Sequence, residues 1–461
     1  MSERLFPSDP KLRKIAKELY ALTAELPIIS PHGHVDPALL VENKPFANPS
    51  ELFLYFDHYI LRLLHAQGFD LAELGRAERS PEIAIEAWRI LCGNWHIFAG
   101  TNSGYWFIEI LENLFGIKET PSAQNADQLY KIIDDKLKSK EFLPRELFKK
   151  FKIEFLATTD DPTDDLANHK IINSDPAFGA KIAPTFRPDK YLDPRSDGWV
   201  TNVRNLLISA GVSELNYQGF IRALEARRKY FITNGAVSAD HGVVEPYTTS
   251  LTTEVASRYF IKAIENQLTP TEARDFAGHM LVEMARMSSE DGLVMTLHAG
   301  VFRNHHAETF EKFGADTGHD FPIKTEFVNN LHPLLNKYGN HPNFKLILFS
   351  LDETTWGREI AALASFYSSV LIGVPWWFLD SPDAILRFRS VTTEVAGFYR
   401  GAGFIDDTRA FLSIPARHDM ARRIDAVYIA RLVSEGRITI TEAKKIAVDL
   451  VVDIPKRAFR L

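Results

Sequence analysis

The chain contains Ser30-Pro31-His32-Gly33-His34-Val35-Asp36-Pro37 directly after an apolar run at residues 26–29. Side chains alternate along a β-strand, so His32 and His34 point to the same side if the strand ends here. Two neutral imidazoles in that arrangement can bind one divalent metal ion. A His-x-His pair is short and frequent, however, and its Pro and Gly neighbours equally fit an ordinary turn. The rest of the chain has to decide between these interpretations.

An apolar run that ends in polar residues occurs seven more times along the chain. The runs are at residues 152–160, 181–187, 236–241, 293–298, 344–350, 369–374 and 404–409. Helical stretches, such as residues 269–287 and 381–399, lie between several of them. Eight alternations of strand and helix predict an α/β fold, a (β/α)₈ TIM-type barrel rather than a doubly wound sheet. Pro184 lies in the third run, and proline is tolerated near a strand end.

The segment between the first and second runs has a different character. Residues 37–148 carry apolar positions at helical spacing without a clear strand, which predicts a long helical insertion after the first strand. Residues 1–36 are then an N-terminal helix and the first barrel strand. Residues 149–461 form the remainder of the barrel and the C-terminal helices.

The composition is that of a globular protein, with 45% hydrophobic and 25% charged residues among 461. A net charge of −7 without a basic block argues against nucleic acid or an anionic membrane as a partner. The single cysteine, Cys92, excludes a disulfide framework and a cysteine-rich zinc module. The N-terminus lacks the apolar core of a signal peptide, and no apolar run reaches membrane-spanning length. We therefore expect a cytoplasmic chain, and a homo-oligomer is compatible with a barrel of this size.

Chemistry in such a barrel takes place at the C-terminal ends of the strands, and most of the predicted strands end in polar groups. These groups are His32, His34, Asp160, Asp161, Arg187, Asp240, His241, His298, Trp376, Asp407 and Arg409. Asp407 belongs to the eighth strand, which adjoins the first when the barrel closes, so it is the natural third metal ligand beside His34. The alternative for Asp407 is a cap on the following helix, which is the usual role of a lone aspartate there.

The other strand ends leave their alternatives open. Arg187 and Arg409 can each bind a carboxylate bidentately, or each can form a salt bridge across the barrel mouth. His298 is a further metal ligand, a hydrogen-bond donor to a substrate, or a buried structural histidine.

The insertion contributes Asp57-His58-Tyr59, followed by Arg62. Burying a charged, a titratable and a phenolic group in a row is costly unless each finds a partner. These residues therefore form a solvated turn between two helices, or at least one of them faces the active site.

Together these motifs resemble the uronate isomerases, a divergent branch of the amidohydrolase superfamily. The matching segments follow in order over nearly the whole chain, at residues 32–34, 57–62, 158–162, 184–190, 240–242, 297–304, 376–378, 407–413 and 417–418. The resemblance implies a distorted barrel with a helical insertion after its first strand. The chain departs from the family in having Gly33 where cysteine is common, which leaves both histidines in place. It also has His305 where the family tends to have asparagine.

The resemblance further implies aldose–ketose isomerisation of hexuronates, from D-glucuronate to D-fructuronate and from D-galacturonate to D-tagaturonate. One divalent ion, zinc, would be bound by His32, His34 and Asp407. The implied catalytic residues are Tyr59, Asp407, Asp240 and His298. The implied substrate-binding residues are His58, Arg187, Arg303, Trp376 and Arg409.

The reaction needs a base that takes the C2 proton of the open-chain sugar and returns it to C1. Tyr59, with its pKa lowered by nearby cationic groups, and Asp407 are both candidates, and the sequence does not choose between them. The rival function is a mononuclear metal-dependent hydrolase of a sugar-acid lactone, with Asp407 as its general base. A two-metal hydrolase is disfavoured because the fourth and sixth strands end in Asp240 and Ser350. Hydrolytic relatives usually have lysine and histidine there.

Overall fold

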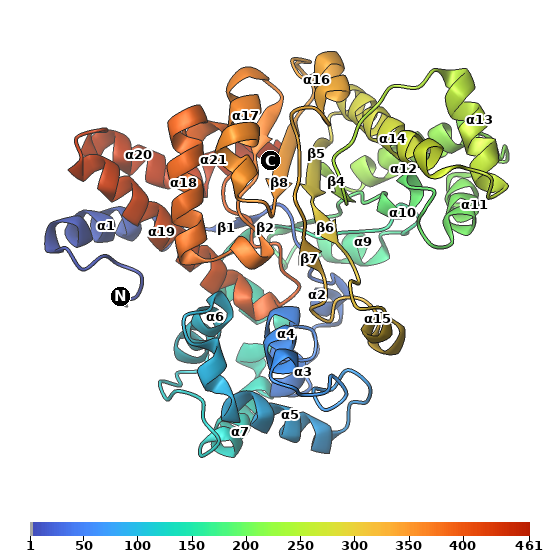
Figure 1. Cartoon of the computed structure of the whole chain (residues 1–461). Helices are drawn as coiled ribbons and strands as arrows, with labels where there is room; N and C mark the ends of the chain where they lie inside the picture. Colours follow the sequence, from blue (N-terminus) through green and yellow to red (C-terminus); the bar gives the residue numbers. More distant parts are fainter. Residues whose placement is uncertain (1–2) are drawn as a thin grey trace.

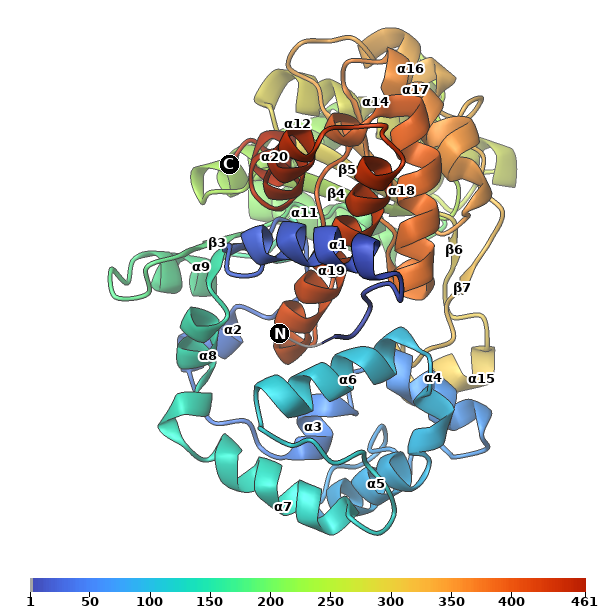
Figure 2. The ribbon, with the colours of Figure 1, turned by 90° about the vertical axis from the view of Figure 1, so that its left-hand side faces the viewer.

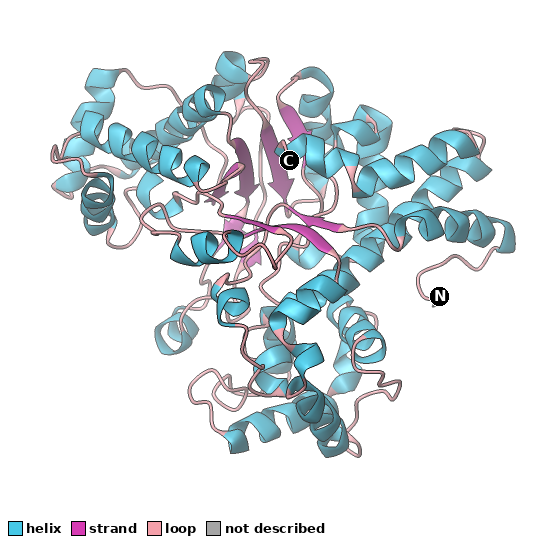
Figure 3. Ribbon diagram, turned by 180° about the vertical axis from the view of Figure 1, so that it is seen from behind, coloured by secondary structure: helices cyan, strands magenta, loops and turns pink. Residues whose placement is uncertain are grey.

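The computed structural model describes residues 3–461 and has two parallel sheets at its centre, with helices around them (Figures 1 and 3). The first sheet has the order β1 (Ile28–Ser30), β2 (Ile153–Ala157) and β3 (Lys181–Ala183). The second has the order β4 (Ser238–Val243), β5 (Val294–Ala299), β8 (Leu346–Ser350) and β9 (Val370–Ile372). Seven of the eight predicted strands are therefore present, and all their pairings are parallel. Parallel strands are buried on both faces, which is why they appear in the sequence as nearly continuous apolar runs.

Isolated bridges continue the pairing beyond the two sheets. Phe186 bridges Asp160 on one side and Ala239 on the other, so the segment after β3 links the first sheet to the second. Ile372, at the end of β9, bridges Gly401 in the same parallel sense. The α/β fold with parallel sheets is thereby confirmed.

The prediction of a regular eighth strand at residues 404–409 is wrong. This segment is irregular and pairs only locally, with the backbone N–H of His34 donating to the carbonyl of Thr408 over 3.0 Å. Asp407 has a φ of 42°, in the left-handed region that a strand does not tolerate. The irregular backbone still leaves Asp407 beside the end of β1.

Residues 37–148 are helical, and the part of the chain described between β1 and β2 contains no strand. The helices are α2 (Ala38–Glu42), α3 (Pro49–Phe53), α4 (His58–Ala66), α5 (Pro81–Gly93), α6 (Asn102–Asn113), α7 (Ala126–Leu137) and α8 (Pro144–Lys150). Helices α3, α4, α5, α6 and α7 gather in one lobe at the side of the sheets (Figure 2). Its aromatic core includes Phe53, whose ring centroid lies 4.9 Å from Phe107 and 6.2 Å from Trp88. The division of the chain into three parts stays a prediction.

The remaining helices cover the sheets. They are α9 (Ala167–Asn173), α10 (Asp189–Leu192), α11 (Trp199–Ala210), α12 (Tyr217–Thr233), α13 (Thr253–Ile264), α14 (Pro270–Asp291), α16 (His332–Tyr338), α17 (Ala362–Phe366) and α18 (Pro382–Ala396). None of the helices described for residues 3–461 combines the length and the apolar character needed to cross a membrane.

The C-terminal helices pack against the N-terminal one. They are α19 (Ile414–Ser434), α20 (Ile440–Val451) and α21 (Asp453–Phe459), and the N-terminal helix is α1 (Pro10–Thr23). Helix α19 is buried along most of its length because α1, α6, α18 and α20 surround it. It contacts α6 of the helical lobe as well as α18, and its N-terminal end lies near the centre of the molecule (Figure 2).

A β-hairpin of two very short strands, β6 (Val301–Phe302) and β7 (Phe321–Pro322), was not predicted from the sequence. Helix α15 (Ala307–Phe313) lies between its strands. Two-residue strands carry no usable periodicity, and their pairing depends on a long intervening loop.

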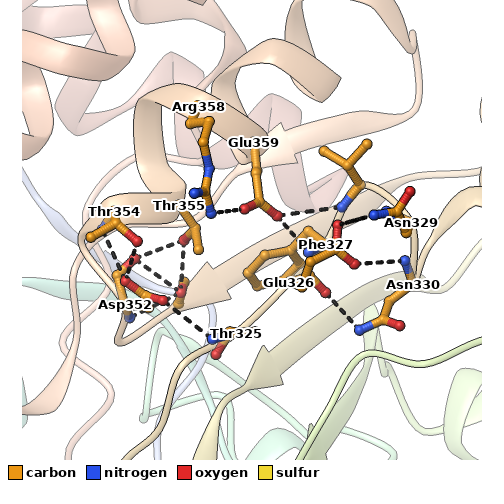
Figure 4. A network of polar contacts seen from close by, with 12 residues as sticks. Thr325, Glu326, Phe327, Asn329, Asn330, Asp352, Thr354, Thr355, Arg358 and Glu359 are labelled. Atoms are coloured by element: carbon orange, nitrogen blue, oxygen red, sulfur yellow. Dashed lines mark hydrogen bonds and ion pairs between the residues drawn. The ribbon is translucent and has the colours of Figure 1, made fainter.

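The segment after this hairpin is anchored by a polar network at the C-terminal end of β8 (Figure 4). Buried Glu359, in a π-helical turn, accepts hydrogen bonds from the backbone N–H groups of Phe327 at 2.6 Å and Val328 at 3.4 Å. Asp352 accepts from the backbone N–H of Thr325 at 3.2 Å. The network thereby fixes residues 325–330 and, through them, one end of the β6–β7 hairpin.

Replacing Glu359 with glutamine should lower the free energy of unfolding by about 1–3 kcal/mol, because two charge-assisted hydrogen bonds to buried N–H groups become neutral or are lost. Urea denaturation measures the change. The matched control is Glu353→Gln, which removes an exposed ion pair to Arg387 at 2.7 Å and should cost less than about 1 kcal/mol. Equal losses in the two variants would contradict the anchoring role of Glu359.

Candidate active site

His32, His34 and Asp407 converge at the end of β1. Oδ1 of Asp407 lies 3.2 Å from Nε2 of His32 and 3.0 Å from Nε2 of His34. One ligand atom from each of the three residues lies within 4.8 Å of the other two. Oδ1 of Asp407 is buried and makes no hydrogen bond despite these neighbours, as expected of a carboxylate oxygen arranged to bind a metal ion rather than a proton. These donors fit one divalent ion, in a set of two imidazoles and a carboxylate.

The electrostatics of Asp407 and His34 favour metal binding. Burial raises the pKa of Asp407, but the two histidines outweigh it and hold the pKa of this carboxyl well below its usual range. Burial lowers the pKa of His34 despite the neighbouring Asp407, which keeps its imidazole in the neutral form that binds metals. For His32, burial is outweighed by Asp240 and Asp407, and the pKa is raised.

A second buried group lies next to the first. Asp240, on β4, accepts hydrogen bonds through Oδ1 from Thr296 at 2.6 Å and pairs with Nδ1 of His298 at 2.7 Å. Nη1 of Arg187 lies 3.4 Å from the other oxygen of Asp240. Burial raises the pKa of Asp240, but His298, His32 and Arg187 together hold it well below its usual range. The carboxylate therefore stays ionised and fixes the orientation of His298.

The ring of His298 is held on three sides by aromatic rings. It stacks on Phe349 with centroids 4.1 Å apart and on His32 at 4.7 Å, while Trp376 meets it edge-on at 5.0 Å. Its Nε2 atom is buried without a hydrogen-bond partner. A buried, unpaired ring nitrogen that is oriented by an aspartate is suited to meet a polar atom of a ligand.

A cavity of about 260 Å³ opens beside these two groups. It is lined by His34, Phe56, Asp57, His58, Tyr59, Arg187, Arg303, Asp316, Trp376, Trp377, Asp407, Thr408, Arg409, Ala410 and Arg417. The lining contains four arginines and three aspartates, so a carboxylate ligand balances its charge. The cavity therefore favours a small, polar, anionic ligand.

The first turn of α4 brings Asp57, His58 and Tyr59 to this cavity. Asp57 caps the helix by accepting from the backbone N–H of Tyr59 at 2.9 Å and of Ile60 at 3.3 Å. Nε2 of His58 accepts a hydrogen bond from Nε1 of Trp377 at 2.5 Å. Burial lowers the pKa of His58 to about 3, which keeps the ring neutral and able to accept. The helical lobe thus forms one wall of the cavity.

The expectation that nearby cations lower the pKa of Tyr59 is wrong. Burial raises the pKa above the ordinary value of 10.0, and the guanidinium of Arg417 only partly offsets it. Desolvation of the charged form exceeds the attraction of one cation here. In the structure the hydroxyl of Tyr59 is therefore protonated at neutral pH.

The arginines predicted for substrate binding line the cavity, and each also has a carboxylate partner. Arg187 pairs with Asp189 at 2.8 Å, in addition to Asp240. Arg409 pairs with Asp316 at 2.9 Å, and Arg303 pairs with Asp320 at 3.0 Å. Arg187 and Arg409 form salt bridges, as considered from the sequence, and the pairings of all three arginines hold the guanidinium groups at the cavity wall.

Eight of the predicted site residues line one cavity, namely His34, His58, Tyr59, Arg187, Arg303, Trp376, Asp407 and Arg409. His32, Asp240 and His298 lie close to it but are almost fully buried. Their roles stay predictions. Sequence reasoning did not identify Asp316, Trp377 and Arg417 as site residues; Trp377 and Arg417 had a signal in the family motifs, whereas Asp316 lies in the unpredicted hairpin loop.

Comparison with known proteins supplies the family. The model of the glucuronate isomerase family matches residues 11–459. The uronate isomerase of Corynebacterium efficiens is 45% identical over 460 residues, covering 100% of this chain and 98% of that protein. The uronate isomerase of Cutibacterium acnes is 46% identical over 461 residues, with the same coverage.

A solved structure agrees with these relatives. The crystal structure of glucuronate isomerase from Caulobacter crescentus superposes with a TM-score of 0.97 at 41% identity, covering 100% of this chain and 96% of that chain. Fold, length and sequence therefore agree over the whole protein, and the chain belongs to the glucuronate isomerase family.

Proposed function

We propose that this protein isomerises hexuronates, converting D-glucuronate to D-fructuronate and D-galacturonate to D-tagaturonate. The observation that carries the proposal is the cavity, where arginines face a tyrosine hydroxyl and an aspartate beside two histidines. Membership of the glucuronate isomerase family supports the same reaction. The carboxylate of an acidic sugar can pair with the arginines, and the tyrosine and the aspartate can transfer protons.

The two parallel sheets continue into each other beside the site. We infer that they are arcs of one distorted (β/α)₈ barrel. The bridges of Phe186 join the sheets on one side, and the hydrogen bond from His34 to Thr408 supports closure on the other. Polar residues at the strand ends then share one mouth, which is where such barrels bind substrates.

His32, His34 and Asp407 are the residues that would hold one divalent ion, and zinc suits two imidazoles and a carboxylate. When bound, such an ion polarises a carbonyl or hydroxyl oxygen of the sugar. The remaining contributions come from side chains of the chain itself.

The isolated protein should contain about one zinc ion per chain, because one donor atom from each of the three residues already lies within 4.8 Å of the other two. Elemental analysis measures this content before and after dialysis against a chelator. His34→Ala should lower it strongly, whereas His341→Ala, at an exposed histidine far along the chain, should leave it unchanged. Equal metal content in the His34 variant and the wild type would contradict the ligand assignment.

The carboxylate of the substrate would be bound by the arginines of the cavity. A guanidinium group offers two parallel N–H donors to a carboxylate and stays charged at every physiological pH. The side chain of Arg187 is 21% exposed and pairs with Asp189 and Asp240, whereas Arg409 and Arg303 are 36% and 43% exposed. Selection of a uronate over a neutral hexose follows from these groups.

Tyr59 is the group to which we assign the transfer of the carbon-bound proton. Asp407 is a weak base, because its pKa is held well below the usual range, and its Oδ1 is directed at two imidazoles. Tyr59 must first lose its phenolic proton, because burial raises its pKa. The resulting phenolate is a stronger base than that carboxylate, so it removes a proton from carbon more readily. The enediol then receives a proton at C1 from the phenol, which exchanges with solvent, and this gives the ketose.

Isomerisation also moves the hydroxyl proton from O2 to O1. We assign this exchange to Asp407, whose carboxylate lines the cavity beside His34. His298, fixed through Nδ1 by Asp240, has its Nε2 free for a sugar oxygen. The two candidates from the sequence thus act on different protons.

The experiment that tests the function supplies D-glucuronate and D-galacturonate to the purified protein and follows ketose formation by NMR. D-glucose and D-glucurono-lactone are the comparison compounds. We expect ketose from at least one uronate and no product from glucose. Hydrolysis of the lactone without conversion of either uronate would replace the isomerase with a metal-dependent hydrolase.

A further inference from the structure

Arg417 lines the cavity and has no part in the proton transfers assigned above. It lies near the start of α19, and its side chain is only 2% exposed. Burying a guanidinium costs free energy unless the group is paired and hydrogen-bonded, so the groups around Arg417 indicate its role.

Three groups fix the guanidinium from behind. Nη1 donates to Oδ2 of Asp380 at 3.0 Å and to the backbone carbonyl of Asp406 at 3.3 Å, while Nε donates to Oγ of Ser413 at 3.0 Å. The indole of Trp106 covers the guanidinium, whose central carbon lies 3.8 Å from the ring centroid. These contacts come from four separate parts of the chain, so the group has little freedom to move.

The guanidinium also lies beside Tyr59. The central carbon of Arg417 lies 5.2 Å from the tyrosine ring centroid. Burial raises the pKa of Tyr59, and the charge and hydrogen bond of Arg417 are the largest influences in the opposite direction. Asp57 also faces Arg417, while Asp380 and Asp407 are the carboxylates that oppose ionisation of Tyr59.

We infer that Arg417 is a positioning residue for proton transfer: held by Asp380, it fixes the hydroxyl oxygen of Tyr59 and stabilises the negative charge on that oxygen. The inference rests on the proposed function. It assigns to this chain a residue pair, Arg417 and Asp380, that acts on the reaction through Tyr59 rather than through the substrate.

Proton transfer begins when the O–H bond of Tyr59 breaks and the phenolic proton passes to solvent in the cavity, which leaves the phenolate beside Arg417. The phenolate oxygen of Tyr59 forms a bond to the C2 proton, and the electron pair of the C2–H bond becomes part of the C1–C2 double bond of the enediol. In the return step the O–H bond of Tyr59 breaks, the proton joins C1, and the phenolate is restored beside Arg417. Arg417 remains protonated throughout, because guanidinium is not deprotonated in proteins. A fixed cation beside a charge that appears and disappears is worth far more in a closed site than in water.

A buried pair between α18 and α19 provides a matched control. Arg389, on α18, forms a buried bidentate pair with Asp425, on α19, with distances of 2.6 and 2.8 Å. Both residues are nearly fully buried, and neither lines the cavity. A purely structural role for the Arg417–Asp380 pair predicts that the two pairs respond alike to removal.

The test compares the double variants Arg417→Met/Asp380→Asn and Arg389→Met/Asp425→Asn, each of which removes both charges and leaves no unpaired ion. The first should lower kcat for the uronate by about 10²–10³-fold with KM within about threefold, because the lost stabilisation exists only while Tyr59 is charged. The control should change kcat by less than about threefold. Thermal unfolding of both variants shows that each is folded.

Chemical rescue separates charge at this position from packing. Guanidinium chloride at tens of millimolar should restore part of the kcat of Arg417→Ala, whereas sodium chloride at the same concentration should not. Rescue should fail in Arg417→Ala/Tyr59→Phe, because the guanidinium then has no phenolate to stabilise.

The outcomes are distinguishable from a failure of the proposed function. If the wild-type protein converts no uronate, the proposed function and this inference are both wrong. If the wild type is active but the two double variants have equal kcat, this inference alone is wrong. The same holds if Arg417→Met/Asp380→Asn changes only KM. Absence of rescue in a folded Arg417→Ala variant also overturns it.

Discussion

Tyr59→Phe should lower kcat by about 10³-fold and leave the fold intact, because it deletes the oxygen that we assign to proton transfer. The ring itself is packed edge-on against Trp106, with centroids 5.7 Å apart, and stacks on His58 at 4.6 Å. Phenylalanine keeps these contacts. Steady-state kinetics with D-glucuronate and D-galacturonate measure the loss.

The matched control for this variant is Tyr55→Phe. Tyr55 belongs to the same helical lobe, is 1% exposed, and has a hydroxyl without a hydrogen-bond partner that does not line the cavity. Its removal should leave kcat within about threefold of the wild type. Near-normal turnover in Tyr59→Phe would show that another group carries the proton.

Asp407→Asn should also abolish most of the activity, with a loss in kcat of about 10³-fold or more. The amide has the shape of the carboxylate but not its charge, so it binds a divalent ion less tightly and exchanges a hydroxyl proton poorly. Bound zinc should fall in parallel with kcat. Elemental analysis and kinetics on the same preparation test both consequences.

Asp406→Asn is the neighbouring control. Asp406 is buried, and its Oδ2 pairs with Nε2 of His418 at 3.0 Å, away from the two metal-facing histidines. Its replacement should lower the melting temperature more than it changes the zinc content. A zinc content that falls equally in both variants would contradict the assignment of Asp407 as the ligand.

The parallel strands could be predicted because burial on both faces requires continuous apolar runs, and the polar residues that follow mark the strand ends. The eighth segment failed this rule. Its apolar residues Phe404 and Ile405 resemble a strand, but the positive φ of Asp407 is set by tertiary contacts that the local sequence does not express. His34 and Asp407 were nevertheless expected to be neighbours, because the first and eighth strands of a (β/α)₈ barrel lie side by side.

Other features of the site depend on contacts between residues far apart in the sequence, which local sequence patterns do not predict. Asp316 lies in a long loop between two-residue strands, and only the folded chain brings it within 2.9 Å of Arg409. The direction of the pKa shift of Tyr59 was misjudged because cationic residues are visible in the sequence whereas the extent of burial is not. Arg417 belonged to a recognised motif, but its pairing with Asp380 and its contact with Tyr59 required the structure.

The central claim is that a proton, rather than a hydride, moves between C2 and C1 of a hexuronate through Tyr59. The most direct measurement is NMR of the ketose formed from D-glucuronate in deuterated water. Because the phenolic proton exchanges with solvent, the account predicts deuterium at C1 of the product. A ketose that forms at the normal rate and carries only protium at C1 would contradict it.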